Sequence, residues 1–238
     1  MRARAREPGA AVSGRERRIV ALDHPNARAA LEQVDALGDS VERYKVGLEL
    51  YIAEGRELVD ALHERDKRVF LDLKLHDIPE TVRRAAEVAS KMGVELLTVH
   101  AAGGRKMLEA AVAGAGATRV LAVTVLTSLD AGDLAADGIA GSVEEAVTRR
   151  ARLAQAAGCA GVIASPQEAA AIRAIVEPGF LVITPGVRLA ATNDDQKRVA
   201  TPRAARQAGA DAIVVGRPIR DAQDRRAAAA AIVRELEG

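Results

Sequence analysis

Between positions 69 and 81 the chain reads VFLDLKLHDIPET, an apolar run that ends in alternating charges. The apolar part is typical of a buried β-strand, and Pro79 predicts the end of that strand and the start of a helix. Side chains two apart on a strand share a face, so we expect Asp72 and Lys74 to project together, with Asp77 close behind. Such clusters concentrate at functional sites, although an ordinary ion pair at a surface strand end would give the same pattern.

The composition limits the class of protein. A chain of 238 residues suits one large domain, and α/β barrels often reach this size. Nearly half of the residues are hydrophobic but aromatic residues are rare, so the core must consist of aliphatic side chains. The net charge of +1 gives no support for nucleic-acid binding, and no apolar run approaches the roughly 20 residues that span a membrane. The single cysteine, Cys159, fits a reducing cytoplasm.

The N-terminal segment differs from the rest of the chain. Residues 1–17 contain arginines among Ala, Gly and Pro, without apolar periodicity. This composition predicts a disordered basic tail, followed by one folded domain over residues 18–238. A transit peptide is an alternative, against which Glu7, Glu16 and a single serine argue. Nucleic-acid binding through the tail is another, supported only by scattered arginines.

Eight short segments rich in Val, Ile and Leu are expected to be parallel strands buried on both faces. They are Arg18–Asp23, Tyr44–Leu50, Arg68–Leu75, Leu96–His100, Arg119–Thr127, Gly161–Ser165, Phe180–Gly186 and Ala212–Arg217.

The segments between them show apolar residues three and four apart, which predicts amphipathic helices. They are Asn26–Leu37, Gly55–Glu64, Glu80–Met92, Lys106–Ala113, Val143–Ala157, Pro166–Ile175, Pro202–Ala208 and Asp224–Leu236. Residues 129–141 are expected to form a loop. Eight strand–helix repeats predict a single (β/α)₈ TIM barrel, an α/β fold. A doubly wound open sheet shares the alternation, but its Gly-rich fingerprint does not follow the first strand.

In such a barrel the chemistry takes place where the strands end in their C-terminal loops. The polar residues at these ends are Asp23, Lys45, Asp72, Lys74, Asp77, His100, Thr127, Ser165, Arg188 and Arg217. Lys45 lies in an apolar context, so it is either exposed at an edge or buried against carboxylates.

The seventh and eighth loops each place a glycine beside an arginine. They read TPGVR at 184–188 and VGRPI at 215–219. Glycine lets the backbone approach an anion, and arginine binds phosphate through parallel hydrogen bonds. Either loop alone is better explained as a tight turn with a solvated arginine. Together they predict a phosphate site for a phosphorylated small molecule.

The segment DLKLHDIPET at 72–81 closely resembles the signature of the orotidine 5′-phosphate decarboxylase family, in its type 1-like bacterial form. The similarity extends over most of the chain. Its other motifs are ALD at 21–23, YKVG at 44–47, VLTS at 125–128, TPGVR at 184–188, DDQKR at 194–198 and GRPI at 216–219.

The resemblance implies an enzyme that converts orotidine 5′-phosphate into UMP in pyrimidine biosynthesis, without metal, flavin or nicotinamide. Its catalytic residues would be Lys45, Asp72, Lys74 and Asp77, an alternating charge network in which Lys74 protonates C6 of the pyrimidine. It also implies a homodimer, with Asp77 and Thr81 reaching the partner's site. The substrate contacts that it implies are Asp23 and Lys45 at the ribose, Thr127 at the pyrimidine, and Pro185, Arg188, Gln196, Gly216 and Arg217 at the phosphate.

Two alternatives remain. Sugar-phosphate enzymes such as hexulose-phosphate synthase and ketogulonate-phosphate decarboxylase share the Asp-x-Lys-x-x-Asp core but use Mg²⁺. They typically carry an acidic residue in place of Lys45, and they lack the Ile-Pro-x-Thr continuation. A phosphate-binding barrel without catalysis is the other, and the presence of every charged member of the network counts against it.

Overall fold

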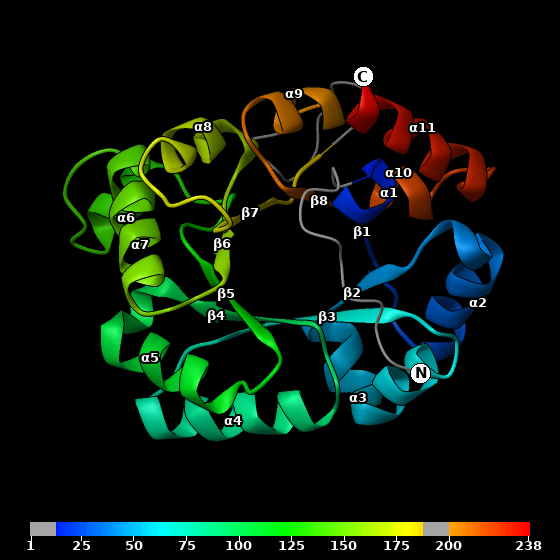
Figure 1. Ribbon diagram of the computed structural model, residues 1–238, viewed down its shortest axis with the longest axis horizontal. Helices are drawn as coiled ribbons and strands as arrows, with labels where there is room; N and C mark the ends of the chain where they lie inside the picture. The colour runs from blue at the N-terminus through cyan, green and yellow to red at the C-terminus, as the bar shows by residue number, and fades with distance from the viewer. Residues whose placement is uncertain (1–12, 188–199) are drawn as a thin grey trace.

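The computed structural model describes residues 13–187 and 200–238, and these form the predicted barrel. Eight parallel strands close in the order β1 to β8, each hydrogen-bonded to the next, with the helices around them (Figure 1). The strands are β1 (Arg18–Ala21), β2 (Arg43–Gly47), β3 (Arg68–Leu75), β4 (Leu96–His100), β5 (Arg119–Val123), β6 (Gly161–Ile163), β7 (Leu181–Thr184) and β8 (Ala212–Val215).

Most strands end earlier than the sequence suggested. β5 stops at Val123 rather than Thr127, and β2 ends at Gly47, where the next helix begins at once. After β5 the apolar pattern continues because the loop residues Val125 and Leu126 face a cavity instead of a neighbouring strand. Apolar periodicity therefore overestimated strand length. It reported the burial of Val125 after β5, but Leu48, after β2, is exposed.

The α-helices alternate with the strands as predicted. They are α1 (Gly14–Arg17), α2 (Ala27–Leu37), α3 (Leu48–His63), α4 (Pro79–Lys91), α5 (Gly104–Gly114), α6 (Ala131–Ala136), α7 (Val143–Ala156), α8 (Ala169–Arg173), α9 (Pro202–Gln207), α10 (Arg217–Arg220) and α11 (Arg225–Glu237). Short 3₁₀ turns precede or follow some of them: η1 (Gly38–Ser40), η2 (Ala101–Gly103) and η3 (Pro166–Glu168). Within the described residues, no helix is long and apolar enough to cross a membrane.

Three helices were not expected. α6 lies in the predicted loop 129–141, where Asp130 and Asp133 form a capping box that starts a helix. α10 begins within residues 215–219, which were expected to form the eighth loop. α1 lies within the predicted disordered tail, and the structure corrects that prediction for residues 13–17. Residues 1–12 lie outside the described part of the chain.

The order of α1 has one local cause and one from the other end of the chain. Ser13 and Glu16 form a capping box, and Gly14 packs so tightly on α11 that an added Cβ would lie 2.9 Å from Cγ of Glu237. Arg17 donates a hydrogen bond to the Asp211 carbonyl, 3.2 Å away. The first turn before β1 is therefore held by the last helix, which closes the ring of helices (Figure 1).

Two apolar layers support the barrel. The larger lies between the strands and the helices, and the smaller fills the barrel interior. The buried residues of the interior layer are Ile19, Ala21, Phe70, Leu96, Leu121, Ile183, Ala212 and Val214. This packed interior closes the barrel beneath the C-terminal ends of the strands, so that a ligand can enter only above it.

The N-terminal rim of the barrel is held by charge. Glu95, just before β4, accepts hydrogen bonds from Arg43, Arg68 and Arg119 at the starts of β2, β3 and β5. Burial would raise the pKa of Glu95, but the three guanidinium groups outweigh it and the pKa lies below its ordinary value. The opposite rim is left for the functional residues.

Candidate active site

The C-terminal ends of the strands surround a cavity of about 260 Å³. Eight of the residues proposed from the sequence line it: Asp23, Lys45, Asp72, Lys74, Thr127, Pro185, Gly216 and Arg217. Its apolar wall consists of Val123, Val125, Leu126, Ile163 and Ala164, and its floor consists of Ala21, Phe70 and Val214 from the interior layer. The cavity thus has a charged side at β1–β3, an apolar side at β5–β6 and a glycine-rich side at β7–β8.

The charged side is a connected network. Asp72 Oδ2 lies 2.9 Å from Lys74 Nζ and 3.5 Å from Lys45 Nζ. Lys45 Nζ also lies 3.4 Å from Asp23 Oδ1. Adjacent strands produce this order, because β2 and β3 pair with Gly47 opposite Asp72. Of the two alternatives for Lys45, the structure therefore shows the one in which carboxylates surround it.

Lys74 owes its position to a backbone irregularity. Its φ is +50°, in the left-handed region that non-glycine residues seldom adopt, and the pairing of β3 with β4 shifts between Leu71 and Leu75. Simple strand alternation predicted that Asp72 and Lys74 would share a face, and their contact is present. It is made, however, through a bulge that the sequence did not predict.

Thr98 on β4 holds this irregular segment. Its hydroxyl donates a hydrogen bond to Asp72 Oδ1 and accepts one from the Lys74 backbone N–H, each with a length of 2.9 Å. The residue is fully buried. Sequence reasoning missed Thr98, and the available signal was a lone polar residue inside the apolar run Leu96–His100.

Asp72 is ionised in spite of its burial. The residue is 8% exposed, and burial by itself would raise the pKa of its carboxyl group. The charges of Lys45 and Lys74, with hydrogen bonds from Lys74 and Thr98, outweigh this effect and hold the pKa below its ordinary value. Its charged form is therefore favoured beside the amino groups of Lys45 and Lys74.

The glycine-rich side depends on a close approach. A Cβ added to Gly216 would lie 2.8 Å from Asp23 Oδ2, so a side chain there would have to displace the Asp23 carboxylate, which lies beside Lys45. Pro185 and Arg217 complete this wall. Two residues expected at the phosphate, Arg188 and Gln196, lie outside the described residues.

Asp77 and Thr81 are not part of the cavity of their own chain. Both are exposed, and Asp77 Oδ1 accepts a hydrogen bond from the Ile78 N–H. Large apolar side chains are exposed beside them and on α3: Ile78, Val88, Leu48 and Ile52. These four exposed residues on the two segments are together called the α3–α4 patch.

Two other strand-end candidates lie elsewhere. Ser165 caps η3, its hydroxyl accepting from the Gln167 N–H. His100 packs against His76, with ring centroids 5.6 Å apart, and neither ring lines the cavity. Burial first, and then the charges of His76, Lys74 and Arg150, lower the pKa of His100.

Comparison with known proteins gives one consistent family. The family model described as orotidine 5′-phosphate decarboxylase / HUMPS family matches residues 16–232. A protein of Anaeromyxobacter sp. (strain K) named orotidine 5′-phosphate decarboxylase is 57% identical, over 93% of this chain and 98% of its own. A protein of Thermobifida fusca with the same name is 52% identical over 92% and 94%.

Solved structures agree with the sequence comparison. The crystal structure of orotidine 5′-phosphate decarboxylase from Lactobacillus acidophilus matches with a TM-score of 0.83 and 38% identity, over 92% of this chain and 98% of that one. The enzyme of the same name from Pyrococcus horikoshii OT3 matches with a TM-score of 0.76 and 27% identity, over 93% and 99%.

The position of Thr98 leads to a test of the network. Thr98→Val should raise the pKa of Asp72, because the carboxylate loses a donated hydrogen bond, and should cost about 1–3 kcal/mol of folding free energy. Since the pKa of Asp72 is depressed in the folded protein, its stabilisation is complete above the ordinary pKa and is lost as pH falls through the folded value. The variant should therefore lose this contribution at a higher pH. Carboxyl-carbon NMR titration and urea unfolding measure both effects.

Thr98→Ser is the matched control. It retains the hydroxyl, so the pKa of Asp72 should stay at the wild-type value. An unchanged Asp72 pKa in Thr98→Val would contradict the assigned role of the hydroxyl.

Proposed function

The chain belongs to the orotidine 5′-phosphate decarboxylase / HUMPS family, and we propose that Lys74, Asp72 and Lys45 carry out its decarboxylation of orotidine 5′-phosphate to UMP. The observation that carries the proposal is the Lys74 ammonium at the cavity wall, 2.9 Å from a buried carboxylate that Lys45 also approaches. This arrangement supplies a fixed positive charge and a proton at one point.

The three sides of the cavity match the three parts of the substrate. Asp23 and Lys45 bind the ribose hydroxyls on the charged side, and the apolar wall receives the pyrimidine, whose edge Thr127 reads. Pro185, Gly216 and Arg217 line the phosphate end. The resemblance implies that Arg188 and Gln196, outside the described residues, also bind the phosphate. In this orientation C6 of the pyrimidine faces Lys74.

The chemistry requires stabilisation of a localised charge. When the bond from C6 to the carboxylate breaks, its electron pair stays on C6 and CO₂ leaves. The resulting vinyl carbanion has no neighbouring carbonyl that could delocalise the pair, so a preorganised positive charge is the main available means of stabilising it. Lys74 provides that charge and then transfers one proton to C6. Asp72 holds the ammonium in place and repels the departing carboxylate.

The alternative with Mg²⁺ is less compatible with this site. Lys45 Nζ lies between Asp23 and Asp72, where a divalent cation would otherwise gain its carboxylate ligands. A fixed ammonium there opposes a second cation. The reaction proposed for this chain needs no cofactor, and its place is the cytoplasm.

A homodimer completes the proposed site. Asp77 and Thr81 lie outside the cavity of their own chain, whereas the resemblance implies that they act in the partner's. Burial of the α3–α4 patch between two copies would remove four large apolar side chains from water.

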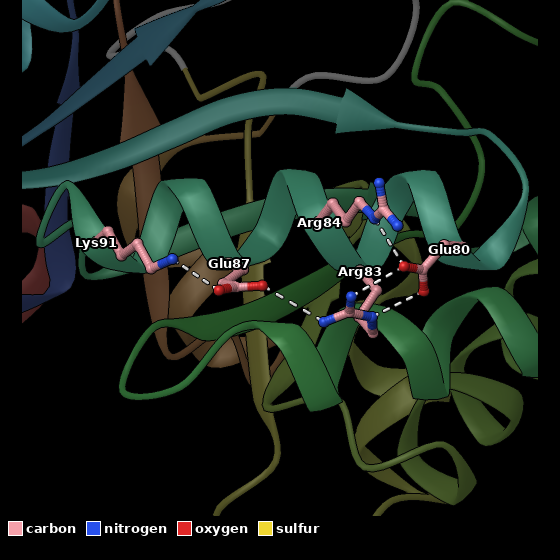
Figure 2. A network of polar contacts seen from close by, with 5 residues as sticks. All are labelled: Glu80, Arg83, Arg84, Glu87 and Lys91. Carbon is pink, nitrogen blue, oxygen red and sulfur yellow. Dashed lines mark hydrogen bonds and ion pairs between the residues drawn. The ribbon is translucent and has the colours of Figure 1, made fainter.

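Ion pairs run along the exposed face of α4. Glu80 accepts hydrogen bonds from Arg83 and Arg84, and Glu87 binds Arg83 and Lys91 (Figure 2). Exposed ion pairs of this kind contribute little stability individually. They form a connected row along α4, which carries Thr81 and begins two residues after Asp77.

The decarboxylase assay tests the proposed reaction directly. Purified protein should consume orotidine 5′-phosphate, followed by its ultraviolet absorbance, at the same rate with and without EDTA. Lys74→Ala should lower kcat by at least about 1000-fold, because both the charge and the proton are lost. Lys106→Ala removes an exposed lysine of α5 and should leave the rate unchanged. No turnover by folded wild-type protein, or loss of turnover in EDTA, would refute the proposal.

Complementation tests the shared site. Lys74→Ala and Asp77→Asn should each be inactive alone. After subunit exchange in an equal mixture, half of the dimers contain one copy of each variant, and one of their two sites then has both native residues. About one quarter of wild-type activity should return. If Asp77 acted in its own subunit, no mixed dimer would contain an intact site and the mixture would remain inactive.

A further inference from the structure

The apolar wall of the cavity is held from behind by an arginine that does not touch the cavity. Arg150, on α7, donates a hydrogen bond from its guanidinium to the Thr124 carbonyl, 2.7 Å away. Thr124 directly follows β5 and is completely buried. The next three residues, Val125 to Thr127, all line the cavity.

Thr124 is tied on its other side to β6. Its backbone N–H donates a hydrogen bond to the Ile163 carbonyl at 3.1 Å, and its hydroxyl donates a second one to the same carbonyl at 3.0 Å. The N–H and the hydroxyl of Thr124 are thus held by β6. Its carbonyl belongs to the peptide that joins Thr124 to Val125 of the cavity wall, and Arg150 holds this carbonyl. Among the described residues, the hydrogen bond from Arg150 is the one that joins this carbonyl to a charged side chain.

The Arg150 guanidinium is partly shielded from water. The side chain is half-buried, and burial, followed by the charge of Arg149, lowers its pKa from the ordinary arginine value. Asp137, at the end of α6, acts in the opposite direction. An arginine remains charged under such conditions, so its hydrogen bond to the carbonyl is charge-assisted.

We propose that Arg150 is a positioning residue that sets the Val125–Thr127 wall and so controls how tightly the site holds the pyrimidine. The inference rests on the proposed function, in which this wall receives the base. It assigns Arg150 no contact with the substrate. Its effect should therefore appear for ligands that carry a base and be absent for ligands that carry only the sugar phosphate.

Arg149 provides a matched control. It precedes Arg150 on α7 and has the same charge, but its side chain is exposed. Arg149→Gln and Arg150→Gln remove the same charge from nearly the same place, whereas only Arg150→Gln removes the support of the Thr124 carbonyl.

The experiment compares inhibition by UMP with inhibition by ribose 5-phosphate, in decarboxylase assays of the full-length protein. Arg150→Gln should raise the inhibition constant of UMP about 10-fold and leave that of ribose 5-phosphate within about twofold. Arg149→Gln should change neither. Arg150→Lys should recover part of the UMP affinity, because a lysine keeps a charged donor. If Arg150→Gln does not fold, as judged by circular dichroism, Arg150→Met must show the same split.

The outcomes separate the two claims. A wild-type protein that neither decarboxylates orotidine 5′-phosphate nor binds UMP would refute the proposed function, and this inference with it. An active wild type with equal losses for both ligands in Arg150→Gln, or with equal effects of Arg149→Gln and Arg150→Gln, would overturn the role of Arg150 alone.

Discussion

The site depends on one buried carboxylate held between two ammonium groups. Removal of Asp72 from water is costly, and Lys45, Lys74 and the Thr98 hydroxyl offset that cost. The same contacts fix the two lysines, because each is drawn to one oxygen of Asp72. The interactions that offset the cost of burying Asp72 therefore also hold Lys74 in place. In the proposed reaction this orientation would need no reorganisation.

The two rims of the barrel differ in role: ion pairs join the strands at the N-terminal rim, and the cavity lies at the C-terminal rim. At the N-terminal rim, Glu95 joins three arginines from different strands, and nothing there opens into the cavity. At the C-terminal rim the strands end early and expose irregular backbone, most clearly the left-handed Lys74. Backbone strain of this kind persists only where surrounding contacts enforce it. At Lys74 these contacts come from the Thr98 hydroxyl on β4 and from the packed barrel interior beneath the site.

Much of this arrangement could be predicted from the sequence, for identifiable reasons. Apolar runs separated by amphipathic segments determine a parallel barrel, and strand ends then locate Asp23, Lys45, Asp72, Lys74 and Arg217 on one rim. Thr98 and Arg150 escaped prediction because each acts through a contact between distant segments: Thr98 with Asp72 and Arg150 with the Thr124 carbonyl. The bulge at Lys74 also depends on the neighbouring strand.

Residues 13–17 show the opposite error. Their composition is typical of a disordered tail, but Gly14 fits against α11, at the other end of the chain. Local composition cannot report such a contact. Asp77 and Thr81 lie outside the cavity of their own chain. Strand order and apolar periodicity do not explain their position, and the second copy proposed for them comes from the family resemblance alone.

The central claim is that Lys74 stabilises negative charge at C6 and exchanges a proton with it. Microscopic reversibility then requires the same lysine to remove the C6 proton of bound UMP. Wild-type protein incubated with UMP in D₂O should introduce deuterium at C6 and not at C5, as detected by proton NMR, and Lys74→Ala should abolish this exchange. Exchange that persists in Lys74→Ala would contradict the account, as would its absence from wild-type protein saturated with UMP.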